Sequence, residues 1–122
     1  ARFFVREYPD VTVNYPGLES SPWHEIAKKQ FKDRFGGILT IRTGSKKRAF
    51  EIINALKLPL IISNIGDTKT LVIHPESTIA AHISDEEKQQ SGVFEDLIRI
   101  SVGIEDIEDL KEDFKQAIES NR

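Results

Sequence analysis

The sequence predicts one α+β domain, in which a small mixed or antiparallel sheet is covered by helices on one face. Two observations lead to this prediction. Strand-like segments alternate with segments whose apolar residues recur at helical spacing. One pair of strand-like segments is joined directly by the turn-prone sequence Asn-Ile-Gly-Asp-Thr-Lys, with no helix between them. No linker or internal repeat divides the 122 residues, which suffice for one core.

The first third of the chain is expected to hold the end of one helix, a strand and a complete helix. Residues 1–8 are typical of the last turns of a helix. The alternating, β-branched stretch 11–15 predicts a strand. Ser21 is expected to cap the next helix, with Pro22 at its first position, and that helix should run to about Arg34.

The middle of the chain contains a helix between strands. A strand is expected over residues 37–42, and a helix should open at Gly44-Ser45. The apolar residues of that helix fit a period of 3.6 and are Ala49, Phe50, Ile52, Ile53 and Leu56. Two further strands are predicted over residues 60–63 and 70–74.

The last third should form a short helix, a strand and a long helix. The sequence Ser-Asp-Glu-Glu at 84–87 has the form of a capping box and predicts a helix that ends near Gly92. Residues 97–102 are predicted to be a strand. From about Asp106 the final helix should run to the C-terminus, with acidic residues in its first turn, where the helix dipole favours them.

Composition excludes several kinds of partner. A net charge of −3 argues against nucleic acid, because phosphate binding needs clustered cations. No apolar run approaches the roughly 18–20 residues of a membrane span, and no signal peptide is recognisable, so we expect a cytoplasmic protein. There is no cysteine, and the three histidines are far apart, so no metal site is expected. His74, at a strand end, is expected to be a structural hydrogen bonder.

Arg99 is a permanent cation inside an apolar strand. The two-residue period of a strand puts Ile98 and Ile100 on one face, and Leu97, Arg99 and Ser101 on the other. A guanidinium among apolar neighbours needs an anionic partner, and its planar fork suits a carboxylate. Composition favours an internal salt bridge to one of the 20 acidic residues, and the alternative is the carboxylate of a substrate.

The stretch Ser-Asn-Ile-Gly-Asp at 63–67 is a second candidate. A serine at a strand end, followed by a glycine-containing turn, can present its hydroxyl and backbone N–H groups to an anion, although an ordinary turn has the same pattern. Trp23 and Tyr15 flank the first complete helix and are expected to be packing anchors. No nucleophile–base–acid set and no phosphate loop is present.

Four motifs together carry a family resemblance. They are Asn-Tyr-Pro-Gly-Leu, Ser-Asn-Ile-Gly-Asp, His-Pro-x-Ser-Thr and Ile-Arg-x-Ser-Val-Gly-Ile-Glu-Asp. In this order, and over essentially the whole chain, they resemble the C-terminal domain of the pyridoxal-phosphate (PLP) enzymes of cysteine and methionine metabolism. The Asn-Ile-Gly-Asp form is most similar to the O-acetylhomoserine sulfhydrylase branch. The resemblance implies the C-terminal fold of the aspartate aminotransferase-like PLP enzymes.

The resemblance assigns roles to three residues. Arg99 matches the arginine that binds the α-carboxylate of the amino-acid substrate, an O-acetylhomoserine-like molecule. Ser63 matches a serine at the edge of that site, with Asn64 beside it, and both help to seat the same carboxylate. On this basis Arg99 is expected to face a ligand and to orient it. The chemistry itself belongs to PLP, which acts as an electron sink.

The resemblance also implies that residues 1–122 are one domain from the C-terminal end of a longer enzyme, with 1–10 as the end of an interdomain helix. The aldimine lysine and most PLP ligands of the family match nothing here and are expected upstream, in a PLP-binding domain. Lys69 matches the turn after the Ser63 strand and is not the catalytic lysine. We therefore expect this chain alone to bind no PLP and to be inactive. Family members are usually homotetramers.

The sequence leaves three possible functions. The first is sulfide addition to O-acetylhomoserine, and the second is another reaction of the family: cystathionine γ-synthase, cystathionine lyase or methionine γ-lyase activity. The third is a standalone, non-catalytic domain that binds a ligand or a protein partner. A standalone domain predicts a well-covered surface, whereas a domain of a larger enzyme predicts an exposed apolar face. Ala80 stands where family members often carry His or Tyr.

Overall fold

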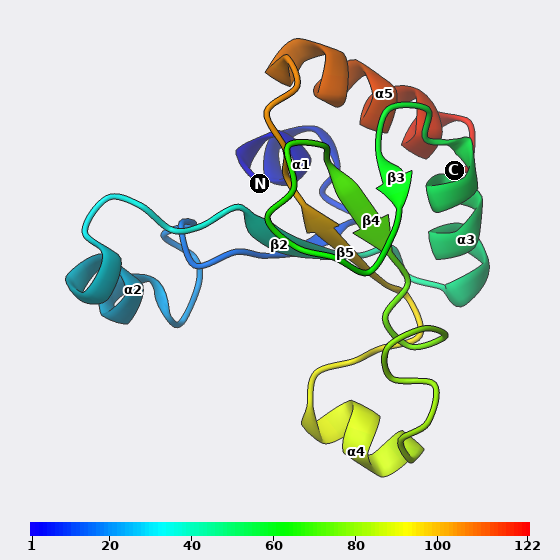
Figure 1. Cartoon of the computed structure of the whole chain (residues 1–122), viewed down its shortest axis with the longest axis horizontal. Coiled ribbons are helices and arrows are strands. Elements are labelled where there is room, and N and C mark those ends of the chain that lie inside the picture. Colours follow the sequence, from blue (N-terminus) through cyan, green and yellow to red (C-terminus); the bar gives the residue numbers. More distant parts are fainter.

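A computed structural model describes all residues, 1–122, as a five-stranded sheet with five helices (Figure 1). The strands are β1 (Thr12–Asn14), β2 (Ile38–Arg42), β3 (Leu60–Ile61), β4 (Leu71–Ile73) and β5 (Leu97–Ser101). The helices are α1 (Arg2–Glu7), α2 (His24–Phe31), α3 (Lys46–Ala55), α4 (Asp85–Gln90) and α5 (Ile107–Glu119). The strand order is β1-β2-β5-β4-β3. Only β3 and β4 pair in parallel, so the sheet is mixed and the predicted α+β class is confirmed.

The core lies between one face of the sheet and helices α1, α3 and α5. Ile98 and Ile100 of β5 point into it, as their period predicts, and both are almost fully buried. The core residues are Phe4, Tyr8, Val11, Leu39, Ile41, Ala49, Ile52, Ile53, Val72, Ile98, Ile100, Phe114, Ala117 and Ile118. Burial of each large aliphatic side chain contributes about 1.5–3 kcal/mol. The structure thus confirms helices on one face.

Three helices begin where the sequence predicts. The Ser45 hydroxyl caps α3 by accepting a hydrogen bond from the Arg48 N–H at 3.2 Å. Ser84 and Glu87 form the complete capping box of α4. The Asp106 carboxylate caps α5 by accepting from the backbone N–H two residues later, at 2.8 Å.

The start of α2 differs from the prediction. Ser21 is not the cap: its hydroxyl accepts a long hydrogen bond of 3.3 Å from the Trp23 N–H, and its carbonyl closes a turn with the His24 N–H. This turn uses the residues that were expected to form the first helical positions, so α2 begins at His24 rather than Pro22.

The same helix also ends early and stands apart from the sheet (Figure 1). Lys32 has a φ of 59°, which no α-helix can continue through, so α2 stops at Phe31 and not at Arg34. Trp23 is 62% exposed, and the expectation that it anchors packing is wrong. Tyr15 does act as an anchor, because it packs against the core and its hydroxyl donates to the Gly36 carbonyl at 2.7 Å.

The connection between β3 and β4 determines what lies on the open face of the sheet. Directly joined strands usually form an antiparallel hairpin, whereas these two are parallel. The chain between them must therefore return along the sheet, and residues 62–70 do so across the face opposite the helices. None of the five helices is long and apolar enough to cross a membrane.

Asp113 is a buried carboxylate that joins α5 to the end of α3. It accepts hydrogen bonds from the backbone N–H groups of Lys57, at 2.9 Å, and Leu58, at 2.8 Å. The side-chain amide of Gln116 donates to it at 3.0 Å. These bonds stabilise the chain reversal after α3, because hydrogen bonds to a charged acceptor are stronger than those between neutral groups.

The substitution Asp113→Ala should lower the free energy of unfolding by about 2–3 kcal/mol, because two backbone N–H groups lose a charged acceptor that is itself buried. Urea denaturation of the chain followed by circular dichroism measures this change. Glu112 is the matched control, since it is an exposed carboxylate of the same helix. Equal losses for Asp113→Ala and Glu112→Ala would contradict the role assigned to Asp113.

Glu76 tethers α4, a helix without a buried residue, to α3. It accepts hydrogen bonds from Lys46 of α3 at 2.6 Å and from Lys88 of α4 at 3.0 Å. The bond from Lys46, followed by that from Lys88, lowers the pKa of Glu76 from 4.5 to about 2. A depressed carboxyl pKa stabilises the folded state above the unfolded pKa, and this contribution is lost as the pH falls toward the folded pKa.

The variant Glu76→Gln should be less stable than the unmodified chain by about 1 kcal/mol at pH 7. The difference should shrink as the pH falls below 4.5 and be lost as the pH falls through about 2, where Glu76 itself becomes protonated. Urea unfolding at several pH values tests this, with the exposed Glu86→Gln as control. A difference that persists unchanged at low pH would show that the ion pairs are not its source.

Candidate functional site

Arg99 lies at the centre of the sheet, on the face that carries no helix. Its strand, β5, is flanked by β2 and β4, and Arg99 is directly opposite Thr40 on one side and Ile73 on the other. The side chain is half-buried. The predicted placement, with Arg99 and Ser101 on the face opposite Ile98 and Ile100, is therefore confirmed.

The guanidinium of Arg99 is held by backbone carbonyls. Its Nη2 donates to the Ser63 carbonyl oxygen at 2.5 Å and, at the limit of hydrogen bonding, to the Asn64 carbonyl oxygen at 3.5 Å. Arg99 takes part in none of the ion pairs of the chain. The internal salt bridge that composition favours is therefore wrong. Both bonds leave from Nη2, so Nε and Nη1 remain for another acceptor.

The structure brings Ser63 and Asn64 to Arg99 through their main chain. Both residues are exposed, and their carbonyl oxygens, not the serine hydroxyl, face the cation. The N–H of Gly66, in the same turn, already donates to the Ser101 hydroxyl at 3.2 Å. The turn thus offers acceptors to a cation, whereas the sequence suggested donors for an anion.

A second set of hydrogen bonds holds the 62–70 segment in place, and the sequence did not reveal it. The Glu105 carboxylate accepts from the Thr70 N–H at 2.7 Å and from the Thr70 hydroxyl at 2.8 Å. The Thr70 hydroxyl accepts in turn from the Gly103 N–H at 2.9 Å. The Ile104 N–H donates to the Thr68 carbonyl at 2.8 Å. Residues that follow β5 therefore hold the segment that covers Arg99.

Two observations show that residues 68–70 pack closely against residues 103–105. Burial is the largest single influence and would raise the pKa of Glu105, but the hydrogen bonds from Thr70 and from the backbone N–H of Glu105, with the charge of Lys69, together hold the pKa below its usual range. A Cβ atom at Gly103 would collide with the Thr68 carbonyl, so only glycine allows the two segments to approach this closely. One sequence feature could have identified Glu105: it belongs to the same motif as Arg99.

His74 is structural, as expected. Its Nε2 lies 2.7 Å from the Glu95 carbonyl oxygen, which can only accept, so Nε2 carries the proton. Nδ1 then accepts from the Ser77 hydroxyl at 2.8 Å. The buried ring also lies against Phe50, with ring centroids 4.6 Å apart. Both ring nitrogens are thus occupied within the protein, which leaves neither for catalysis.

The substitution His74→Phe keeps the ring but removes both hydrogen bonds. It should lower the free energy of unfolding by about 2–3 kcal/mol, because the Glu95 carbonyl and the Ser77 hydroxyl lose their partner. Thermal and urea unfolding measure the loss. Substitution of the exposed His82 by Phe is the control, and stability unchanged in both variants would contradict the structural role.

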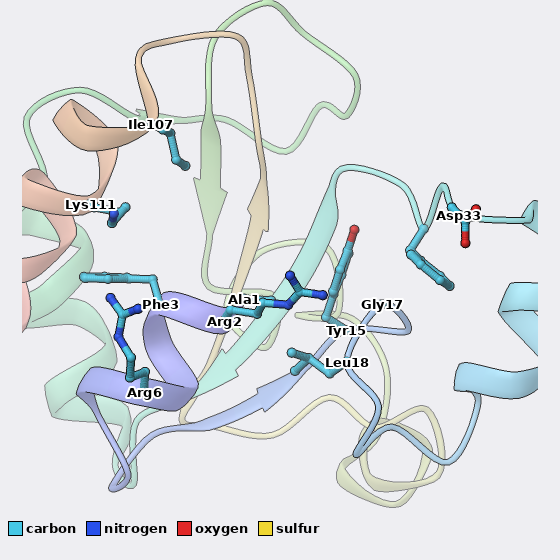
Figure 2. A pocket seen from close by; sticks show the side chains of 11 residues that line it. Ala1, Arg2, Phe3, Arg6, Tyr15, Gly17, Leu18, Asp33, Ile107 and Lys111 are labelled. Carbon is cyan, nitrogen blue, oxygen red and sulfur yellow. The ribbon is translucent and has the colours of Figure 1, made fainter.

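A cavity of about 520 Å³ lies elsewhere, beside α1 and the start of α5 (Figure 2). Figure 2 shows Arg2, Arg6 and Lys111 around it, with the rings of Phe3 and Tyr15. Arg99, Ser63 and Asn64 do not line it. The predicted site residues therefore belong to the open sheet face and not to this cavity.

Comparison with known proteins agrees with this fold and these motifs. A model of the family described as Cys/Met metabolism PLP-dependent enzyme matches residues 1–119. The chain belongs to this family of PLP-dependent enzymes.

Named relatives narrow the assignment within the family. The chain is 44% identical to homocysteine synthase of Schizosaccharomyces pombe, with 95% of the chain covered. It is 46% identical to O-acetyl-L-homoserine sulfhydrylase 1 of Thermus thermophilus, with 94% covered. It spans 28% of the length of each of these relatives.

Two solved structures show the same fold. A putative O-acetylhomoserine (thiol)-lyase of Campylobacter jejuni superimposes with a TM-score of 0.90 at 41% identity. That match covers 95% of this chain and 28% of the other. Cystathionine gamma-lyase from yeast gives a TM-score of 0.89 at 35% identity, covering 98% of this chain and 31% of the other.

The residues of this chain do not by themselves fit a PLP site. The cofactor needs a lysine amine shielded from water, and no lysine is buried here. Lys69, in the turn after Ser63, is exposed. Ala80 is buried, and its N–H donates to the Pro75 carbonyl at 3.0 Å, so it presents no side-chain donor.

Proposed function

We propose that this chain is the C-terminal, substrate-binding domain of a PLP-dependent O-acetylhomoserine sulfhydrylase. The complete enzyme adds sulfide to O-acetylhomoserine and releases homocysteine and acetate. The observation that carries the proposal is the state of Arg99: a half-buried guanidinium without an anionic partner, on an open sheet face. The similarity to two relatives named for this chemistry supports it.

Arg99 binds the α-carboxylate of the amino acid through the guanidinium N–H groups that the Ser63 and Asn64 carbonyls leave free. These carbonyls accept from Nη2 and thereby fix the plane of the guanidinium before the substrate arrives. A fixed plane makes the charged contact directional, so the substrate amine and side chain are oriented as well as bound.

The surface supports a domain of a larger enzyme over a standalone domain. Fifteen large apolar side chains are exposed, among them Trp23 at 62% and Ile104 at 82%. A standalone domain would cover such residues, because exposed apolar side chains favour association. Several belong to the segments around the site, such as Ile61, Ile62 and Ile65.

The complete enzyme contains parts that this chain lacks. PLP is bound by residues of another domain and supplies the electron sink for the reaction. The role of this chain is limited to holding the carboxylate. The longer protein forms a homotetramer, as the family resemblance implies.

A second reaction of the same family is the alternative. L-Methionine gamma-lyase of Fusobacterium nucleatum is 40% identical over 95% of the chain, and the yeast cystathionine gamma-lyase shares its fold. The full-length protein should be assayed with sulfide and O-acetylhomoserine, for cystathionine synthesis, and for elimination from cystathionine and methionine. If sulfide with O-acetylhomoserine is the poorest pair, the sulfhydrylase assignment is wrong.

The variant Arg99→Lys of the full-length enzyme should raise the KM for O-acetylhomoserine about 10- to 100-fold. Lysine keeps the charge but loses the fork, which removes charged hydrogen bonds worth about 1.5–3 kcal/mol. Steady-state kinetics at saturating sulfide measure the change. The exposed Arg34→Lys is the matched control. An unchanged KM in Arg99→Lys would overturn the role proposed for Arg99.

A further inference from the structure

We propose that Glu105 is a positioning residue of the carboxylate site. Through Thr70 it holds the 62–70 segment so that the Ser63 and Asn64 carbonyls reach the Arg99 guanidinium. The inference rests on the proposed function, because it assumes that Arg99 binds a carboxylate. It adds a residue that contacts neither the substrate nor Arg99.

The segment needs such a hold because burial does not supply one. Residues 61–69 are all exposed, so few apolar contacts keep the chain on the sheet. Its path is set instead by hydrogen bonds to residues 101–105, which directly follow Arg99 in sequence. Arg99 and the residues that hold its cover therefore lie on one continuous strand and turn.

Among these bonds, those to Glu105 are the strongest. The Gly66–Ser101 bond, at 3.2 Å, and the Ile104–Thr68 bond, at 2.8 Å, join neutral groups. Glu105 instead accepts two short bonds, of 2.7 and 2.8 Å, and charge-assisted bonds are roughly twice as strong as neutral ones. Thr70 is fully buried, so the contact also has little competition from water.

Loss of this contact should affect carboxylate binding rather than the chemical step. A loosened segment no longer keeps the Ser63 carbonyl against Nη2, so the guanidinium plane is free to rotate. Binding then has to order the side chain, which weakens affinity without removing the cation. A general loss of folding would instead lower the concentration of active enzyme, and kcat would fall while KM stayed constant.

The test compares Glu105→Ala with Glu105→Gln in the full-length enzyme. Glu105→Ala should raise the KM for O-acetylhomoserine about tenfold, with kcat changed by less than about twofold. Glu105→Gln should restore most of the affinity, because its amide can accept from the Thr70 N–H and donate to the Thr70 hydroxyl. Glu112→Ala is the control at an exposed carboxylate.

A pair of inhibitors makes the readout specific for the carboxylate. Homoserine carries it, and 3-aminopropanol is the same molecule without it. Glu105→Ala should raise the inhibition constant of homoserine about tenfold and leave that of 3-aminopropanol within about twofold. Equal changes for both inhibitors would overturn the inference. If Glu105→Ala does not accumulate, Thr70→Val, which removes one of the two bonds to Glu105 together with the bond from the Gly103 N–H, should shift the same ratio by about threefold.

A comparison with Arg99→Lys shows whether a negative result concerns only Glu105 or also the proposed function. If Arg99→Lys raises the inhibition constant of homoserine and Glu105→Ala does not, Glu105 is not a positioning residue and the proposed function stands. If neither variant affects homoserine binding, Arg99 is not the carboxylate site, and both proposals fail together.

Discussion

The parallel pairing of β3 with β4 is the constraint on which the candidate site depends. An antiparallel hairpin would have turned the connecting residues back at the edge of the sheet and left Arg99 uncovered. Because the two strands run in the same direction, residues 62–70 must cross the open face. The crossing brings two carbonyls to the guanidinium and leaves its other nitrogens accessible. The direction of this one pair of strands thus brings the fixed carbonyl neighbours to the cation.

Local sequence signals predicted the elements better than their long-range partners. Ser45, Ser84 and Asp106 cap helices through groups within three residues, so their patterns are sufficient. The direction of β3 depends on contacts across more than 30 residues, such as Thr70 with Glu105, which no local pattern contains. The prediction for the start of α2 failed for a different reason: the residues around Ser21 form a local turn of their own, which competes with the cap pattern and delays the helix.

The same contrast between local signals and long-range partners applies to Arg99. Strand periodicity placed the side chain on the correct face, because that depends only on the residue's own position. Periodicity could not identify the partner of Arg99. Composition favoured an acidic residue, whereas the observed partners are backbone carbonyls. The family motifs pointed to a ligand, since they bring together residues far apart in the chain. The sequence did not single out Glu105, because it directly precedes the acidic residues at the start of α5 and could not be told apart from them.

The position of Trp23 has a practical consequence. It is the only tryptophan of the chain, and it lies directly before α2, in the arm that stands apart from the sheet, largely in contact with water. Its fluorescence emission should therefore barely change when the core between the sheet and the helices unfolds. The same emission should shift to shorter wavelength when another surface covers the arm. A single intrinsic probe thus separates the assembly of the complete enzyme from the folding of this domain.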